Sequence, residues 1–278
     1  MPFLHRDSVA LYFEDAAGAD RPIVLIHGWC CDHAFFAPQA SYFASLGHRI
    51  VSLDLRGHGR SDKPQQPYPI GTFSDDVAWL CRELELLKPI LVGHSMGGIV
   101  AFDVAARHPD LPAAIVMLDA AVVLPAAARA AIPEFLQRLR GPDYVLALRK
   151  LVSSTFFVAS DDPVRKAHIL DEMTKTPQQV MASSYQGLGE FRADDAKGRI
   201  VVPSLYVAAD EPSPRSDMAQ LLELVPQLSL GRTVGSGHFC QLETPDRVNA
   251  MIARFIAVTL GARTPITPKH LVRDDKPL

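Results

Sequence analysis

Short apolar runs alternate with longer amphipathic stretches along most of the chain. The runs 22–26, 90–92 and 113–118 contain no charged residue, which is typical of strands buried on both faces of a parallel sheet. The alternation therefore predicts a mostly parallel sheet covered by helices, an α/β fold. Strands are expected at 8–13, 22–26, 49–54, 90–92, 113–119, 200–208 and 228–234, and helices at 33–46, about 72–87, 96–108, 216–225 and 244–259.

The helix expected from about residue 72 shows the pattern most clearly. Thr72 to Asp75 resembles a capping box, in which a hydroxyl side chain and an acidic side chain satisfy free amides at a helix start. The apolar face that follows consists of Val77, Leu80, Leu84 and Leu87.

The regular alternation stops between 120 and 196. Helical patches occur there at 132–139, 144–151 and 164–173, but no run indicates a parallel strand. We interpret 120–196 as a helical cap inserted into an α/β core made of 1–119 and 197–262. The remaining segment, 263–278, is polar and contains proline, and we expect a loose tail.

The run 90–92 leads into Gly93-His94-Ser95-Met96-Gly97, which precedes a helical pattern. This is a G-x-S-x-G motif in the strand–turn–helix context that it requires. The sharp turn needs small residues on either side of Ser95, and it lifts the serine hydroxyl clear of the sheet. It also places the Met96 amide at a helix N-terminus, where a developing oxyanion would be stabilised.

Several polar residues come directly after predicted strands. Because active sites in parallel sheets lie at the carboxyl ends of the strands, we expect these side chains to converge on one edge. They are His27, Asp54, Ser95, Asp119, Asp210 and His238.

Composition narrows the class of protein. The 278 residues are 48% hydrophobic and 21% charged, with a formal net charge of −3, which suits a globular domain with a large core. No basic run is present, so we do not expect the protein to bind nucleic acid. The four cysteines show no metal-type spacing, and we expect reduced thiols in a cytoplasmic protein without a metal or cofactor. No apolar run is long enough to span a membrane, and residues 1–7 contain no apolar segment of signal-peptide length, so we expect neither a membrane span nor a signal peptide.

Four motifs together resemble the α/β-hydrolase family in order and spacing. They are His27-Gly28-Trp29, the segment from Asp54 to Asp62, Gly93 to Gly98, and Gly237-His238. The resemblance covers nearly the whole chain outside the cap and tail. It implies an α/β-hydrolase fold in which Ser95 is the nucleophile. A serine hydroxyl needs a base, and His238 is the candidate because it follows the last strand.

The resemblance also assigns supporting roles. The backbone N–H groups of Trp29 and Met96 are the expected oxyanion donors. His27, His94 and Phe239 are expected beside the substrate, and His27 is also expected to brace the oxyanion loop.

The acid that orients His238 has two candidates. Asp210 follows the strand after which most of the family carries its acid, but its loop lacks the usual glycine and the aspartate comes early. Asp119 follows the strand after the nucleophile. Certain haloalkane dehalogenases and cofactor-free ring dioxygenases place the acid there, and we favour Asp119 slightly.

These residues predict a serine hydrolase that forms an acyl-enzyme on Ser95. Because the cap is rich in Leu, Val, Ala and Phe, we expect a small apolar or aromatic carbonyl substrate, cleaved at an ester or a carbon–carbon bond. A cofactor-independent dioxygenase of N-heteroaromatic rings, using a His/Asp dyad, is the alternative enzyme. A non-catalytic ligand sensor on the same fold is the third hypothesis.

Overall fold

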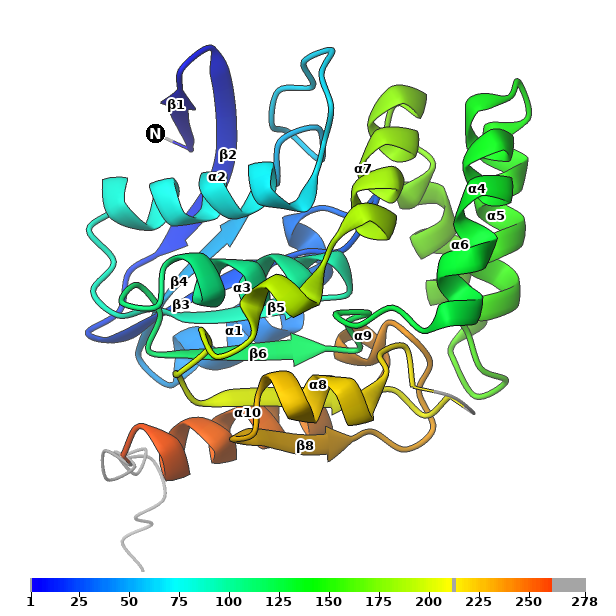
Figure 1. Cartoon of the computed structure of the whole chain (residues 1–278). Coiled ribbons are helices and arrows are strands. Elements are labelled where there is room, and N and C mark those ends of the chain that lie inside the picture. The colour runs from blue at the N-terminus through cyan, green and yellow to red at the C-terminus, as the bar shows by residue number, and fades with distance from the viewer. Residues whose placement is uncertain (1, 212–213, 262–278) are drawn as a thin grey trace, which may run out of the picture.

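A central eight-stranded sheet organises the chain in the computed structural model, which describes residues 2–211 and 214–261 (Figure 1). The strand order is β1-β2-β4-β3-β5-β6-β7-β8. The first two strands pair antiparallel to their neighbours, and the pairs from β4–β3 to β7–β8 are parallel. The strands are β1 (Phe3–Arg6), β2 (Val9–Ala16), β3 (Asp20–Ile26), β4 (His48–Leu53), β5 (Ile90–His94), β6 (Ala114–Leu118), β7 (Ser204–Ala208) and β8 (Leu228–Arg232).

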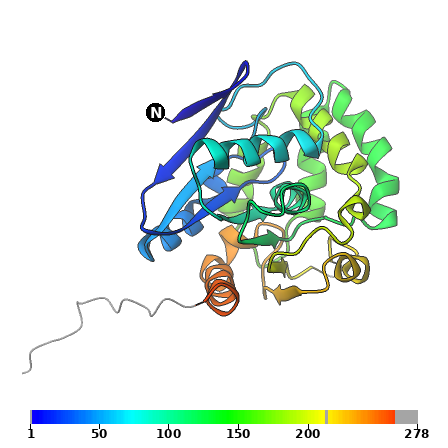
Figure 2. The same cartoon turned by 60° about the vertical axis from the view of Figure 1, so that its left-hand side comes forward.

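Helices cover both faces of this sheet, so the expected α/β fold is confirmed (Figures 1 and 2). One layer contains α2, α3 and α8, and the other contains α1 and α10. Outside the cap, the helical elements are η1 (His33–Phe36), α1 (Ala37–Ser45), α2 (Ile70–Glu83), α3 (Met96–Arg107), α8 (Met218–Leu224), α9 (Cys240–Glu243) and α10 (Pro245–Thr259).

Alternate residues of each inner strand serve the two layers. Ile23 and Leu25 of β3 pack in one core with Phe43 of α1, whereas Val24 and Ile26 pack in the other. Side chains that point to both faces must therefore be apolar, which explains the uninterrupted hydrophobic runs in the sequence.

Two details expected of α2 are wrong. The helix begins at Ile70 after Pro69, and no side chain caps it, so Thr72 to Asp75 is not a capping box. The helix ends at Glu83, and Leu87 is 83% exposed. Glu85, with a φ of 50°, turns the chain out of the helix before Leu87.

Four helices lie between β6 and β7, beside the carboxyl ends of the parallel strands (Figure 1). They are α4 (Ala126–Arg140), α5 (Tyr144–Thr155), α6 (Pro163–Met173) and α7 (Gln178–Glu190), followed by η2 (Ala193–Ala196). The sequence patches correspond to α4, α5 and α6, while α7 was not expected. The division at 120 and 196 stays a prediction, and the predicted tail at 263–278 lies outside the described residues. Among the described helices, none has both the length and the apolar character that crossing a membrane requires.

Candidate active site

The turn between β5 and α3 holds Ser95 in a backbone conformation that L-residues rarely adopt, with φ 52° and ψ −118°. Its flanking glycines are required by close packing. A Cβ on Gly93 would lie 2.0 Å from the Gly97 oxygen, and a Cβ on Gly97 would lie 2.0 Å from the Ile26 oxygen. Ser95 is partly exposed between its buried neighbours His94 and Met96.

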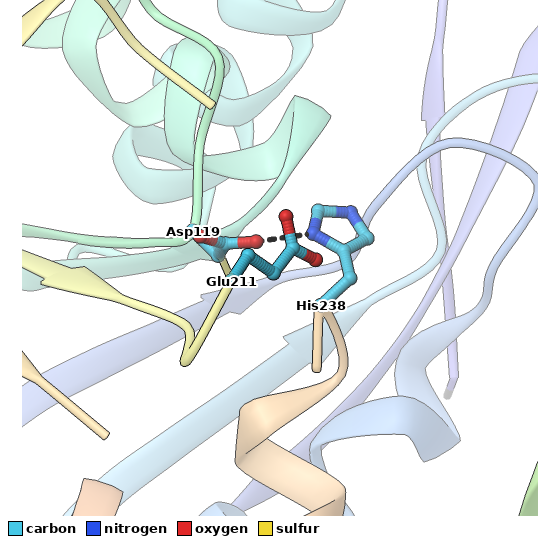
Figure 3. A group of neighbouring side chains, drawn as sticks. All are labelled: Asp119, Glu211 and His238. Atoms are coloured by element: carbon cyan, nitrogen blue, oxygen red, sulfur yellow. Dashed lines mark hydrogen bonds and ion pairs between the residues drawn. The ribbon is translucent and has the colours of Figure 1, made fainter. Parts of the chain in front are cut away.

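His238 and Asp119 meet at this edge. The Nδ1 atom of His238 lies 2.7 Å from Oδ2 of Asp119, and both side chains are 2% exposed (Figure 3). An ionised Asp119 can only accept, so Nδ1 carries the proton and Nε2 keeps the lone pair that a general base needs. The Ala209 N–H donates to the other Asp119 oxygen at 3.0 Å and fixes the carboxylate.

Backbone contacts connect Ser95 to this pair on two sides. The Ser95 N–H donates to the oxygen of Leu118, the residue before Asp119, at 2.9 Å. His94, the residue before Ser95, donates from Nε2 to the His238 carbonyl oxygen at 2.9 Å. The imidazole rings of His94 and His238 lie 4.6 Å apart between centroids. The predicted nucleophile after β5, the predicted acid after β6 and the predicted base in the loop before α9 therefore lie in segments that contact one another.

Asp210, the other candidate acid, is directed elsewhere. Its carboxylate accepts from the Gly235 N–H at 2.8 Å and from Arg232 at 3.0 Å. Both contacts are exposed, and the first fixes the turn three residues before His238. Within the described residues, Asp210 has no hydrogen bond to the His238 ring.

Burial and charge set the protonation states of the pair. Burial and, after it, the nearby positive charge of Arg215 lower the pKa of His238, Asp119 opposes both effects, and the resulting pKa is about 4. Burial alone would raise the pKa of Asp119, but the hydrogen bond from His238 and the charges of His238 and Arg215 hold it at about 2. At neutral pH the site therefore contains an ionised aspartate and a neutral imidazole.

The two expected oxyanion donors lie on either side of the serine turn. Met96 is the first residue of α3, so its N–H has no acceptor within the helix. Gly28 packs against the turn, since a Cβ there would lie 3.2 Å from the Ser95 Cβ, and Trp29 follows it. The Trp29 indole donates to the Met181 oxygen at 3.0 Å, which fixes this loop beneath the cap.

His27, His94 and Phe239 are 0%, 1% and 1% exposed, respectively. His27 donates from Nδ1 to the Gly28 oxygen at 2.8 Å and accepts at Nε2 from the Leu55 N–H at 3.0 Å. Both of its ring nitrogens are therefore used by backbone groups, as a bracing role requires. That these three side chains lie beside the substrate stays a prediction.

Aromatic side chains from the cap also approach the site. The Phe156 ring lies 4.4 Å from the His238 ring between centroids. The Tyr185 ring of α7 lies 5.0 Å from the Trp29 indole and 4.9 Å from Phe135 of α4. These rings place apolar surface over the Trp29 loop and His238.

Sequence reasoning missed Arg215 and Glu211, which follow β7. Arg215 donates from Nε to the Asp119 oxygen that also accepts from His238, at 2.8 Å. Polar atoms of Asp119, Glu211 and His238 lie within 4.8 Å of one another, as metal ligands would, but Arg215 already pairs with both carboxylates. The sequence feature that could have indicated this residue is that Arg215 is the one basic residue between 200 and 231.

Comparisons with known proteins agree with this fold. The model of the alpha/beta hydrolase fold family matches residues 21–245. YisY of Bacillus subtilis, an AB hydrolase superfamily protein, is 30% identical over 90% of this chain and 96% of its own. The (E)-2-((N-methylformamido)methylene)succinate hydrolase of Acinetobacter baylyi is 24% identical over 92% of this chain and 97% of its own.

Solved structures share the architecture. The enol-lactonase of Burkholderia xenovorans LB400 superposes with a TM-score of 0.82 at 23% identity, covering 92% of this chain and all of that one. The chain therefore belongs to the alpha/beta hydrolase fold family, and it is a hydrolase enzyme of that family.

Proposed function

We propose that this protein is a serine hydrolase that cleaves a carboxylic ester of a small apolar or aromatic acyl group. The observation that carries the proposal is the buried His238–Asp119 hydrogen bond, joined through His94 and Leu118 to the strained Ser95 turn. A base with an accepting Nε2, beside a serine raised on such a turn, is the arrangement that nucleophilic acyl transfer needs.

In the proposed reaction, Ser95 Oγ attacks the ester carbonyl while His238 Nε2 takes the hydroxyl proton. The negative charge on the carbonyl oxygen is stabilised by the N–H groups of Trp29 and Met96. When the tetrahedral intermediate collapses, the bond to the alcohol breaks and His238 protonates the departing oxygen. Water then attacks the acyl-enzyme with His238 again as base, which releases the acid and restores Ser95.

Support for the substrate class comes from the cap and from the names of relatives. Phe156 and the rings around Trp29 supply an apolar surface suited to an acyl group without many polar substituents. The structural relatives include an enol-lactonase and an esterase from Thermogutta terrifontis. An ester is therefore the first substrate to test, and the same groups would serve for cleavage of a carbon–carbon bond next to a carbonyl.

The test uses p-nitrophenyl acetate turnover together with covalent labelling by a fluorophosphonate. We expect turnover by the wild type and a single adduct on Ser95. Ser95→Ala should lose the adduct and at least about 10³-fold in turnover, because the nucleophile is gone. Ser229→Ala, an exposed position on β8, is the matched control and should retain both. A wild type that neither turns over nor reacts would refute a serine nucleophile.

The same Asp119–His238 pair also suits the cofactor-independent dioxygenase, in which histidine deprotonates an N-heteroaromatic substrate before oxygen reacts. Oxygen uptake with a 3-hydroxy-4-oxoquinoline distinguishes the two functions. Uptake that survives in Ser95→Ala would favour the dioxygenase, whereas a hydrolase requires the hydroxyl.

A further inference from the structure

Arg215 is fixed by three hydrogen bonds next to the proposed acid. Its Nε donates to Asp119 Oδ2 at 2.8 Å, and its Nη2 donates to Glu211 Oε1 at 2.5 Å and to the Thr155 oxygen at 2.7 Å. The guanidinium carbon also lies 4.6 Å from the centre of the Phe156 ring. Because the Arg215 side chain is 17% exposed, water screens its charge only partly.

Glu211 brings a second carboxylate to the imidazole. Its side chain extends from the segment after β7 past Asp119 toward the His238 ring (Figure 3). A Glu211 oxygen lies within 4.8 Å of polar atoms of both residues, and its side chain is 13% exposed. Burial raises the pKa of Glu211, Arg215 counteracts this effect, and Asp119 adds to it. Arg215 therefore favours the ionised form of this glutamate.

These charges bear directly on the base. Arg215 Nε and His238 Nδ1 bond to the same Asp119 oxygen, so the guanidinium and the imidazole are two hydrogen-bond lengths apart at most. When His238 accepts the serine proton, two cations face one carboxylate oxygen. An isolated arginine at that place would disfavour the imidazolium.

We propose that Arg215 and Glu211 act as one positioning unit for His238: Arg215 fixes the Asp119 carboxylate, and Glu211 offsets the arginine charge so that the imidazole still accepts a proton. This inference rests on the proposed function, because it concerns the same proton transfer. Neither residue touches the reacting atoms, and both act through Asp119 and His238.

Other polar groups around His238 come from separate elements and stay constant in the test. His94 at the end of β5 is kept neutral, since burial lowers its pKa well below the usual value. Asp161, between α5 and α6, accepts from the Gly237 N–H at 2.9 Å. The Tyr206 hydroxyl of β7 donates to the Ala120 oxygen at 3.0 Å, and burial raises the pKa of the Cys240 thiol in α9.

The experiment measures the rate of fluorophosphonate labelling of Ser95 against pH. The wild-type rate should fall in acid near pH 4, where His238 titrates. Arg215→Gln should move this acidic limb upward by about one to two pH units, because a neighbouring cation is removed. Glu211→Gln should move it downward and reduce the plateau rate about tenfold, because the arginine charge is no longer offset. The double variant should return close to the wild-type limb.

Two further variants separate charge from geometry. Arg215→Lys keeps the charge but lacks the planar fork that reaches both carboxylates, so the limb should stay near the wild-type position while the plateau rate falls. Arg138→Gln removes an exposed ion pair with Glu134 on α4 and should change neither quantity.

Different results would refute the positioning unit and the proposed serine hydrolase. Failure of Ser95 to label in the wild type would refute the serine hydrolase. An NMR titration of the His238 ring reads the same shifts without any reaction, and folding of each variant is checked by thermal melting. Arg215→Gln and Glu211→Gln variants that fold but leave the His238 titration unchanged, or that shift it in the same direction, would overturn the positioning unit.

Discussion

Asp119→Asn removes one oxygen and one negative charge from a group whose two oxygens accept three N–H bonds. Oδ1 accepts from Ala209, and Oδ2 accepts from His238 and Arg215. An asparagine has a single acceptor oxygen, so its NH₂ group must face at least one of these donors. The imidazole then loses the partner that fixes its tautomer and stabilises its charge.

The expected loss in kcat is about 10³ to 10⁴-fold, which corresponds to about 4 to 5.5 kcal/mol of transition-state stabilisation. A buried donor left unpaired costs about 1 to 3 kcal/mol of folding stability in addition. Turnover of p-nitrophenyl acetate gives the first quantity, and urea denaturation gives the second.

Asp210→Asn is the matched control, because this exposed carboxylate bonds to Gly235 and Arg232 and not to the imidazole. We expect it to lose less than about tenfold in kcat, through loosening of the turn before His238. If folded Asp119→Asn keeps more than a tenth of the wild-type kcat, or if Asp210→Asn loses as much, the assignment of the acid is refuted.

Three further outcomes are expected. The kcat/KM of the wild type should stay on its plateau as the pH falls through 6.5 and decline only near pH 4, because burial and the charge of Arg215, opposed by Asp119, leave the pKa of His238 at about 4; a decline centred at 6.5 would contradict the geometry. In chemical denaturation, Gly97→Ala should destabilise the fold by at least about 3 kcal/mol, because its Cβ would lie 2.0 Å from a backbone oxygen of β3. Gly71→Ala in α2 is the control and should be neutral or slightly stabilising, because the nearest atom to its Cβ would be 3.5 Å away. Asp76→Ala should cost about 3 to 5 kcal/mol in the same assay, because it leaves the buried Arg56 guanidinium without its two bonds at 2.6 Å; a loss below about 1 kcal/mol would show that water reaches that site.

The family assignment depends on patterns that the sequence carries locally. Runs of apolar residues predict buried strands because both faces of the sheet are covered, and the glycines around Ser95 predict the sharp turn because no side chain fits there. Such patterns involve residues close together in the chain, so they can be recognised without knowing the fold. The end of α2 was misjudged because Leu87 continues the apolar period beyond the helix, while the backbone at Glu85 has already turned away.

The contacts among the site residues join parts of the chain that are far apart in the sequence. The order of residues in the sequence left Asp119 and Asp210 both as candidates for the partner of His238. Only the folded chain brings Asp119, 119 residues away in the sequence, to the His238 ring. Arg215 and Glu211 gave almost no signal, because a single ion pair in a loop has no periodicity. Strand positions follow from burial, which acts on each segment separately. Which carboxylate contacts His238, and which charges surround it, follow from side-chain distances between segments, and those distances exist only once the sheet has formed.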